Sequence, residues 1–446
     1  MKVRRFLATR VHGYLNLPVE IRPDLTFLTG INGSGKTTVV NGISALITPS
    51  LSYLAETKYE RMEVEIEVAD EIITIAAEKD GDLLSLKSSH DPEPLTIAIL
   101  PQNDVLPPSR AYERDFDYYR DAEARHAGHP VMKRIRALPT PMFLGLERRS
   151  SSYFGFDAPT PPVARRRTHN PFASSLARSL TEAVALAELS YSGVQAGLRE
   201  LTDDLKRKFI LSALQYAPAE RKRVRPPELD PQNIARVRAT LRELGLADNE
   251  ITKHLDPIVA KLKEISAYLP FDEDLNKVLS GPDHAKASAY LEWFTNASQF
   301  ERLAKLLRHV DRYVAKSQSA TRHIDAYLET VNQFLGDSKK GLLFDRTGNL
   351  VVSIRSQTPR PVSSLSSGEV QIVVILTHLA FNPAAQADNI FLIDEPELSL
   401  HLRWQELFVQ AIRTLNPRLQ TILATHSPAI ILEEVDRCVD LSALQR

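Results

Sequence analysis

The residues best suited to chemistry begin with a glycine-rich run near the N-terminus that fits G-x-x-x-x-G-K-[ST], from Gly30 to Thr37. The run lies between a predicted strand (residues 25–29) and a predicted helix (residues 37–46), as a phosphate-binding loop should. Glycines let backbone N–H groups turn inward around phosphates, and a helix N-terminus adds partial positive charge. The run therefore predicts a nucleotide site whose residues are Asn32, Gly33, Ser34, Gly35, Lys36, Thr37 and Thr38.

Two side chains of this run have specific predicted roles. Lys36 can reach the β- and γ-phosphates of a nucleotide, and the Thr37 hydroxyl can bind Mg²⁺. ATP and Mg²⁺ are therefore the cofactors that we expect.

A second run, of four apolar residues at 390–393, ends in the carboxylates Asp394 and Glu395. A buried strand that delivers one carboxylate to the metal ion and one to the attacking water forms the second half of a P-loop ATPase site. Such a strand is common taken alone, but its pairing with the glycine-rich run predicts ATP hydrolysis. Asp394 would share the metal with Thr37, and Glu395 would orient or deprotonate the water.

Three further motifs surround Asp394 in a fixed order. Leu-Ser-Ser-Gly-Glu at 365–369 opens a predicted helix, Pro-Glu-Leu-Ser-Leu-His follows the carboxylates at 396–401, and Ala-Thr-His-Ser-Pro lies at 424–428. A lone serine–glycine helix start is usually a simple N-cap. The order of all three motifs around Asp394 favours a functional role.

These motifs resemble those of the ABC-type ATPases of the SMC, Rad50 and RecF class. Within that class they are similar to the overcoming-lysogenization-defect (OLD) type ATPases of bacterial anti-phage systems, over roughly residues 1–60 and 340–446. The resemblance implies that His426 is a switch residue near the γ-phosphate and acts with Glu395 in catalysis. It also implies that Ser366, Ser367 and Gly368 contact the ATP held by a second subunit. Two heads would then enclose two nucleotides.

The family also places a glutamine-containing loop between the core and the helical part, and here two segments compete for that place. Pro101-Gln102 is one, and residues 143–148, an apolar strand ending in Glu147 and Arg148, are the other. We favour the second and assign Glu147 to the nucleotide site, because a strand that leads into a helical insertion is the expected topology.

The resemblance also implies partners. OLD-type nucleases carry a C-terminal TOPRIM domain, whereas this sequence ends twenty residues after His426. The sequence therefore points to the ATPase subunits of two-component systems such as PARIS and Septu. We expect a homodimer or higher homo-oligomer, a separate effector nuclease of TOPRIM or HNH type, and a phage-encoded trigger protein. The alternatives are a RecF-like repair ATPase that binds DNA directly and a scaffold that binds ATP without hydrolysing it.

The surrounding pattern predicts the elements that position these motifs. Alternating apolar residues predict strands at 63–68, 72–77 and 83–86, and frequent prolines between residues 101 and 171 argue against long helices there, with one short strand at 142–146. Helical spacing dominates residues 172–335, but Pro226, Pro227 and Pro270 break it, which favours a compact insertion over a long rod. A hairpin at 342–354 and alternating strands and helices at 370–424 follow.

The predicted fold class is α/β: an ABC-type P-loop ATPase head, with a mixed sheet and a flanking antiparallel β-subdomain, interrupted by a large helical insertion. The predicted domains are an N-terminal lobe (1–155), a helical oligomerisation domain (156–340) and a C-terminal lobe (341–446).

Composition narrows the function further. The 446 residues include 55 Lys and Arg against 56 Asp and Glu, which excludes a uniformly basic nucleic-acid coat. Any contact with DNA would have to come from a local patch, and the densest basic runs are residues 165–167 and 221–225. The single cysteine, Cys438, excludes an intramolecular disulfide framework, and no apolar run approaches the eighteen or so residues of a membrane span. We therefore expect a soluble cytoplasmic protein with no membrane contact.

Overall fold

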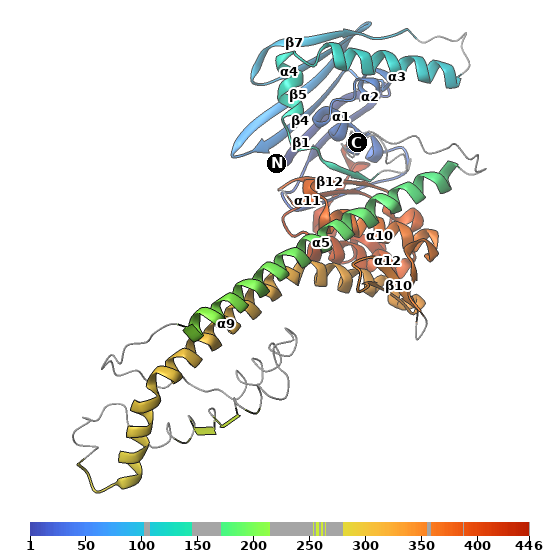
Figure 1. Ribbon diagram of the computed structural model, residues 1–446. Helices are drawn as coiled ribbons and strands as arrows, with labels where there is room; N and C mark the ends of the chain where they lie inside the picture. The colour runs from blue at the N-terminus through green and yellow to red at the C-terminus, as the bar shows by residue number, and fades with distance from the viewer. Residues whose placement is uncertain are drawn as a thin grey trace. The chain divides into compact units, whose positions relative to one another are not determined.

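The computed structural model describes residues 1–101, 108–144, 171–214, 280–354, 358–386 and 388–445, together with six isolated positions between 253 and 264. It divides into two compact units, one formed by residues 1–190 and 323–446 and the other by residues 191–322. Figure 1 shows the elements of both.

A five-stranded parallel sheet organises the first unit. Its order is β14 (Cys438–Asp440), β3 (Leu25–Thr29), β13 (Gln420–Ala424), β12 (Ile390–Asp394) and β8 (Met142–Leu144), and every neighbouring pair is parallel. All five residues of β12 and of β13 are buried, as is typical of inner strands of a parallel sheet, and their apolar residues lie at 390–393 and 422–424. Because the strands are parallel, the segments that follow β3, β12 and β13 leave the sheet at the same edge.

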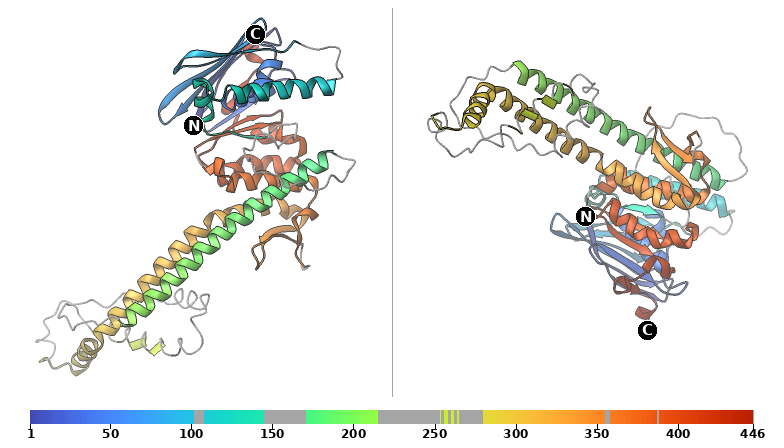
Figure 2. Two further views of the ribbon diagram at one scale, coloured as in Figure 1. Left: turned by 45° about the horizontal axis from the view of Figure 1, so that its top comes forward. Right: turned by 90° about the horizontal axis from the view of Figure 1, so that it is seen from below.

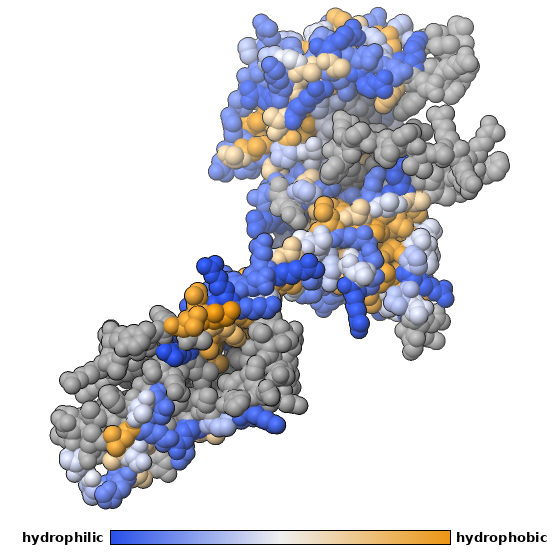
Figure 3. Space-filling model, in the orientation of Figure 1, coloured by the Kyte–Doolittle hydropathy of each residue, from blue (hydrophilic) through white to orange (hydrophobic). Residues whose placement is uncertain are grey.

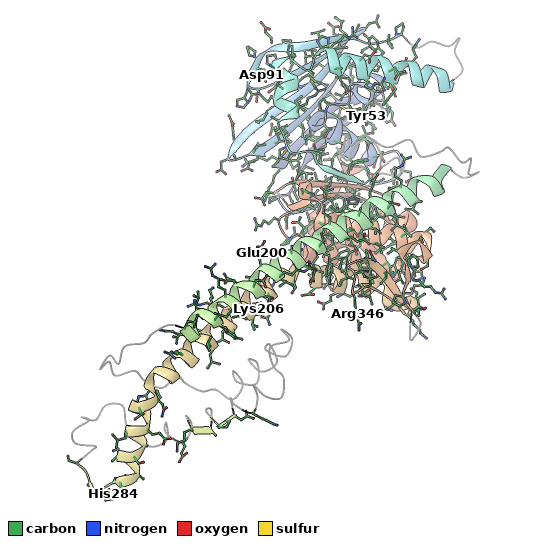
Figure 4. All side chains as sticks on the ribbon, viewed as in Figure 1. Tyr53, Asp91, Glu200, Lys206, His284 and Arg346 are labelled. Atoms are coloured by element: carbon green, nitrogen blue, oxygen red, sulfur yellow. The ribbon has the colours of Figure 1, made fainter. Side chains whose placement is uncertain are left out.

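A six-stranded antiparallel sheet forms the rest of the N-terminal half. Its order is β2 (Leu15–Glu20), β1 (Lys2–Val11), β4 (Arg61–Val68), β5 (Glu71–Asp80), β6 (Leu83–Ser88) and β7 (Asp91–Ala98). Helices α2 (Leu51–Glu56), α3 (Pro108–Arg125) and α4 (Pro130–Arg136) accompany it. Arg134 of α4 donates to Asp91 of β7 at 2.7 Å, so the helix is tied to the edge strand (Asp91 is labelled in Figure 4).

Helix α1 (Lys36–Ile47) packs between the two sheets. It contacts β4 and β5 of the antiparallel sheet and β12 and β13 of the parallel sheet. A Cβ added at Gly42 would lie 2.8 Å from the ring of Phe6 on β1, so only glycine permits this approach. The helix that begins at the phosphate loop is thus fixed from both sides.

One buried amide also joins the two sheets. Gln420, at the start of β13, has no exposed surface. Its Nε2 donates to the carbonyl oxygens of Val3 and Arg22, both at 2.7 Å, and its Oε1 accepts from the Val3 N–H at 2.7 Å. A single side chain therefore satisfies three backbone groups of the N-terminal segment.

The C-terminal half completes the first unit. A small antiparallel sheet of β9 (Lys340–Phe344), β10 (Leu350–Ile354) and β11 (Arg360–Pro361) precedes α10 (Ser367–Phe381) and α11 (Pro383–Gln386). Helices α12 (Leu402–Leu415) and α13 (Pro428–Ile431) follow β12 and β13. This alternation of strands and helices matches the pattern that the sequence predicts.

The second unit contains parts of two long helices, α5 (Pro171–Leu214) and α9 (His284–Leu335) (Figures 1 and 2). They pack side by side through buried Leu205 and Val310, and Thr202 Oγ1 lies 3.2 Å from the Tyr313 hydroxyl. Near the end of α5, Ile210 and Leu214 are exposed, and Figure 3 shows hydrophobic surface there.

The unit boundaries at 190 and 323 lie inside the predicted domain of residues 156–340. The cause is that both long helices continue into the first unit. There Tyr327 of α9 is fully buried with its hydroxyl 2.7 Å from Thr377 Oγ1 of α10, and Glu188 of α5 accepts from the Leu350 N–H at 2.9 Å.

Two expectations about helix length are wrong. Helix α3 has 18 residues within the proline-rich stretch, because Pro108 is its first residue, where no helical N–H is needed. Helix α9 runs for 52 residues, about 78 Å at the usual rise, and α5 for 44, because Pro226, Pro227 and Pro270 lie between the two helices and not inside them. In the described ranges, no helix is both long and apolar enough for a membrane span.

We predict that Gln420→Ala lowers the free energy of unfolding by about 2–4 kcal/mol, because two buried backbone groups of Val3 and the carbonyl of Arg22 lose their partner. Urea denaturation of the purified protein measures this. Gln410→Ala is the matched control, since Gln410 is exposed on α12. Equal losses in the two variants would show that Gln420 does not join the sheets.

Candidate nucleotide site

The loop between β3 and α1 has a backbone that requires glycine. Gly30, Gly33 and Gly35 have φ angles of 136°, 82° and 95°, a region that side chains disfavour. A Cβ at Gly30 would lie 2.7 Å from Ser34 Oγ, and one at Gly35 would lie 3.0 Å from Leu17. The glycines of the motif are thus needed for the shape of the loop, which leaves its backbone open to a phosphate group.

Lys36 places a positive charge at this loop. It is the first residue of α1, its side chain is buried, and its Nζ donates to the carbonyl oxygens of Gly30 and Ile31 at 3.2 and 3.3 Å. Burial lowers the pKa of Lys36, and the nearby carboxylates of Asp394 and Glu395 oppose that shift. An ammonium group held by two carbonyls of the loop is well placed to exchange them for phosphate oxygens.

Thr37 and Asp394 bring the two halves of the sequence together. Thr37 Oγ1 donates to Asp394 Oδ1 at 3.2 Å, across 357 positions of sequence. Asp394, at the end of β12, is only 3% exposed, and burial raises its pKa to about 6. Glu395 and Glu397 raise the pKa of Asp394 further, while the Thr37 hydrogen bond and Lys36 act against the rise.

These oxygens fit a magnesium ion. Mg²⁺ prefers oxygen ligands and is usually held by one or two protein groups together with phosphates. Thr37 and Asp394 supply a hydroxyl and a carboxylate side by side, and a cation there would offset the cost of ionising the buried Asp394.

Glu395 and His426 face each other at the same edge of the sheet. Glu395 has a φ of 48°, in the left-handed region, and its N–H donates to the Ala424 carbonyl of β13 at 2.9 Å. His426 follows β13, and its Nε2 lies 3.8 Å from Glu395 Oε1. Both side chains remain partly exposed, at 22% for Glu395 and 34% for His426, so a water molecule can reach them. Strained backbone of this kind is typical of functional sites.

The signature segment, Leu-Ser-Ser-Gly-Glu at 365–369, stands at the start of α10. Ser366 is the N-cap of that helix and forms a capping box with Glu369: the Glu369 N–H donates to Ser366 Oγ at 3.4 Å, and the Ser366 N–H to Glu369 Oε2 at 2.7 Å. The side chains of Ser366 and Ser367 are exposed, and Gly368 is half-buried. In the described part of the chain, Ser366 bonds only within α10 and does not touch the phosphate loop.

The remaining predicted residues divide into described and undescribed positions. Asn32 is exposed in the loop, Ser34 is buried there, and Thr38 is half-buried in α1. Strand β8 confirms the strand before Glu147 and pairs with β12. Glu147 and Gln102, the two competing loop residues, lie outside the described residues, as do the basic runs 165–167 and 221–225.

Sequence reasoning missed several supporting residues. Ser442, near the C-terminus, accepts from the Ile31 N–H of the phosphate loop at 3.0 Å, and nothing in the sequence signals this. Glu369 pairs with Lys340 Nζ at 2.8 Å and accepts from Ser338 Oγ at 2.6 Å. Burial alone would raise the pKa of Glu369, but these partners outweigh it and hold it at about 2. The Ser-x-x-Glu spacing of a capping box could have identified Glu369.

Fold and site together define the class of the protein. A parallel sheet carries a glycine-rich phosphate loop and an acidic pair at one edge, beside an antiparallel sheet, and long helices interrupt the chain between its two halves. This is the fold of an α/β P-loop ATPase head with a helical insertion, and the predicted fold class is confirmed.

Comparison with known proteins gives the family. Residues 183–433, more than half of the chain, match the family described as "AAA domain, putative AbiEii toxin, Type IV TA system". The chain belongs to this family. The matched range contains the signature segment, Asp394, Glu395 and His426, whereas the phosphate loop precedes it.

One curated relative is the "Retron Vc95 probable ATPase" of Vibrio cholerae serotype O1 biovar El Tor, 30% identical over 113 residues. The similar segment is 23% of this chain and 22% of the relative, so the chain spans about a fifth of that protein's length.

Among solved structures, the chain is similar to the Smc head domain of Pyrococcus furiosus with an extended coiled coil bound to the C-terminal domain of ScpA. The identity is 11% and the TM-score 0.37, over 96% of this chain and 91% of that one. For the Smc head with a coiled coil and joint of Pyrococcus yayanosii the values are 12% and 0.35, over 96% and 93%. For an SmcHead bound to the C-winged helix domain of ScpA they are 9% and 0.39, over 97% and 91%.

We predict that Asp394→Asn stabilises the nucleotide-free and magnesium-free protein at pH 7.5. The folded pKa of about 6 lies above the ordinary aspartate value of 3.8, so ionising Asp394 costs stability as the pH rises from about 4 to 6. Asparagine avoids this cost and keeps an oxygen for Thr37. We expect a gain of roughly 1–3 kcal/mol, since one pKa unit corresponds to about 1.4 kcal/mol.

Urea denaturation in EDTA at pH 7.5 and pH 5 measures this gain, which should shrink at the lower pH. A variant less stable than the parent at pH 7.5, or a gain independent of pH, would contradict the assigned pKa.

Proposed function

We propose that the protein binds and hydrolyses ATP at this site as the ATPase subunit of a bacterial anti-phage defence complex. The observation that carries the ATPase part is the 3.2 Å contact between Thr37 and Asp394, which assembles phosphate loop and acidic strand from distant parts of the sequence. The family membership supports it, because its description names an AAA domain and residues 183–433 match it.

Each residue of the nucleotide site has its own role in the proposed reaction. The backbone of the phosphate loop and Lys36 bind the phosphates, while Thr37 and Asp394 hold the metal ion. Mg²⁺, when bound, supplies positive charge that neutralises the phosphate oxygens. Glu395 accepts a proton from the attacking water or orients it, and His426, 3.8 Å away, donates a hydrogen bond toward the γ-phosphate.

The defence role rests on the relatives. The family description names a "putative AbiEii toxin, Type IV TA system", and the curated relative is named a retron "probable ATPase". Within this proposal the chain forms ATP-sandwiched homodimers or higher homo-oligomers, responds to a phage-encoded trigger and controls a separate TOPRIM- or HNH-type nuclease. The exposed Ser366 and Ser367 support this ATP-sandwiched dimer. A rigid, capped helix N-terminus with exposed hydroxyls can bind a phosphate group of the ATP that a second subunit holds. Direct DNA binding, as in a RecF-like repair ATPase, stays a prediction.

We predict that Glu395→Gln abolishes turnover but keeps ATP binding. The amide cannot accept a proton from water, so phosphate release should fall by about 100-fold or more, as losses of a general base usually do. Binding of a fluorescent ATP analogue should stay within about threefold of the parent, because no phosphate contact is assigned to Glu395. The matched control is Glu406→Gln, at an exposed position on α12. Unchanged turnover in Glu395→Gln would favour the scaffold without hydrolysis.

A mixing experiment tests the proposed sandwich. Lys36→Ala and Ser366→Arg should each be inactive, the first through loss of a phosphate contact and the second through an arginine at the signature position. In a mixed dimer, an intact phosphate loop of one subunit meets an intact signature of the other, so we expect phosphate release to recover. A mixture as inactive as its components would contradict sites shared between subunits.

A further inference from the structure

Glu397, two positions after Glu395, is bonded to the segment that carries the switch histidine. Its Oε1 accepts from Thr425 Oγ1 at 2.9 Å and from the His426 N–H at 2.6 Å. Both donors lie after β13, 28 and 29 positions away in sequence. One carboxylate oxygen thus holds the backbone of His426 in place.

Gln405 of α12 closes this contact into a ring. Its Nε2 donates to the Leu400 carbonyl at 2.8 Å and to the Glu397 carbonyl at 3.4 Å, and its Oε1 accepts from Ser427 Oγ at 2.6 Å. The Ser427 N–H donates to Thr425 Oγ1 at 3.0 Å, which leads back to Glu397. Residues 396–400 and 425–427 are therefore joined at two points.

The segment 395–397 is held at its other end by the sheet. Asp394 and Ala424 are paired in the parallel register of β12 and β13, and the Glu395 N–H donates to Ala424. Pro396 follows at once and restricts the backbone further. The sheet fixes the position of the Glu395 backbone, and Glu397 fixes the position of the His426 backbone.

The second oxygen of Glu397 suggests why a carboxylate stands here. Oε2 is buried and has no hydrogen-bond partner within the described ranges. A buried polar atom without a partner is unfavourable, so Oε2 itself adds nothing to the stability of the fold. The contribution of Glu397 to the structure therefore comes from Oε1, which holds the switch segment, residues 425–427.

We propose that Glu397 is a positioning residue that sets His426 against Glu395, with Gln405 as its support. The inference rests on the proposed ATPase function and deepens it. Among the described residues, no hydrogen bond or ion pair joins Glu397 to the phosphate loop, and its carboxylate acts on Lys36 only through its charge. Its loss should therefore lower the rate of hydrolysis and leave ATP binding nearly unchanged.

Amide hydrogen exchange of the nucleotide-free protein tests the positioning without any catalysis. In Glu397→Ala the His426 amide loses its acceptor, and we expect its exchange to accelerate at least tenfold. Glu397→Gln keeps an acceptor oxygen and places its amide nitrogen where Oε2 has no partner, so exchange should stay close to the parent's. Glu406→Ala, an exposed change on α12, is the control. An unchanged His426 amide in Glu397→Ala would overturn the inference.

Steady-state kinetics test the consequence. Glu397→Ala should lower kcat by roughly 10- to 100-fold, the loss typical when a hydrogen-bond partner that orients an active-site residue is removed. KM should stay within about threefold of the parent's, and Glu397→Gln should recover most of kcat. A loss expressed mainly in KM, or no loss at all, would overturn the positioning role. If Glu397→Ala does not fold, Gln405→Ala opens the same ring, and unchanged kcat there would likewise overturn it.

These outcomes are separate from the fate of the proposed function. A parent protein that hydrolyses no ATP would refute the ATPase role, while the exchange comparison would still decide whether Glu397 holds the switch segment.

Discussion

The crowding of negative charge at one edge of the parallel sheet is the constraint on which the rest of the structure depends. Asp394, Glu395 and Glu397 lie within four positions of the chain, and Asp394 is almost completely buried. Burial, with a smaller contribution from Glu395 and Glu397, raises the pKa of Asp394 to about 6, although the Thr37 hydrogen bond and Lys36 oppose the rise. A cation stabilises a site of this kind, and ATP supplies one because it binds together with Mg²⁺.

The surrounding fold holds these charges in place against their mutual repulsion. Strands β12 and β13 are buried along their whole length, and α1 is packed between two sheets, so neither the carboxylates nor Lys36 can move apart cheaply. At the signature segment the same device recurs: Glu369 caps α10 and is paired with Lys340, which follows α9 closely in the chain. Charged residues in the first unit thus act as fixed parts of the backbone scaffold as well as of the site.

Local patterns predict the elements that carry the candidate site, because its motifs are short and each includes the element that positions it. The strand at 25–29, the loop after it and the acidic end of β12 were all identified in this way. Contacts across long sequence separations were not predictable: Gln420 bonds Val3 across 417 positions, and Ser442 bonds Ile31 across 411. No local pattern encodes such a pair. Helix lengths differ from the expectation for a related reason: proline is compatible with the first turn of a helix, and spacing in the sequence does not show on which side of a helix end it lies.

Calorimetric titration of the purified protein with ATP tests the central claim most directly, namely that the phosphate loop and Asp394 form one magnesium-dependent nucleotide site. With Mg²⁺ at pH 7.5 we expect saturable binding of one nucleotide per chain. The affinity should weaken at least about tenfold in EDTA and should also weaken as the pH falls below 6, where Asp394 becomes protonated. Absence of binding, or binding of equal strength with and without Mg²⁺, would contradict it.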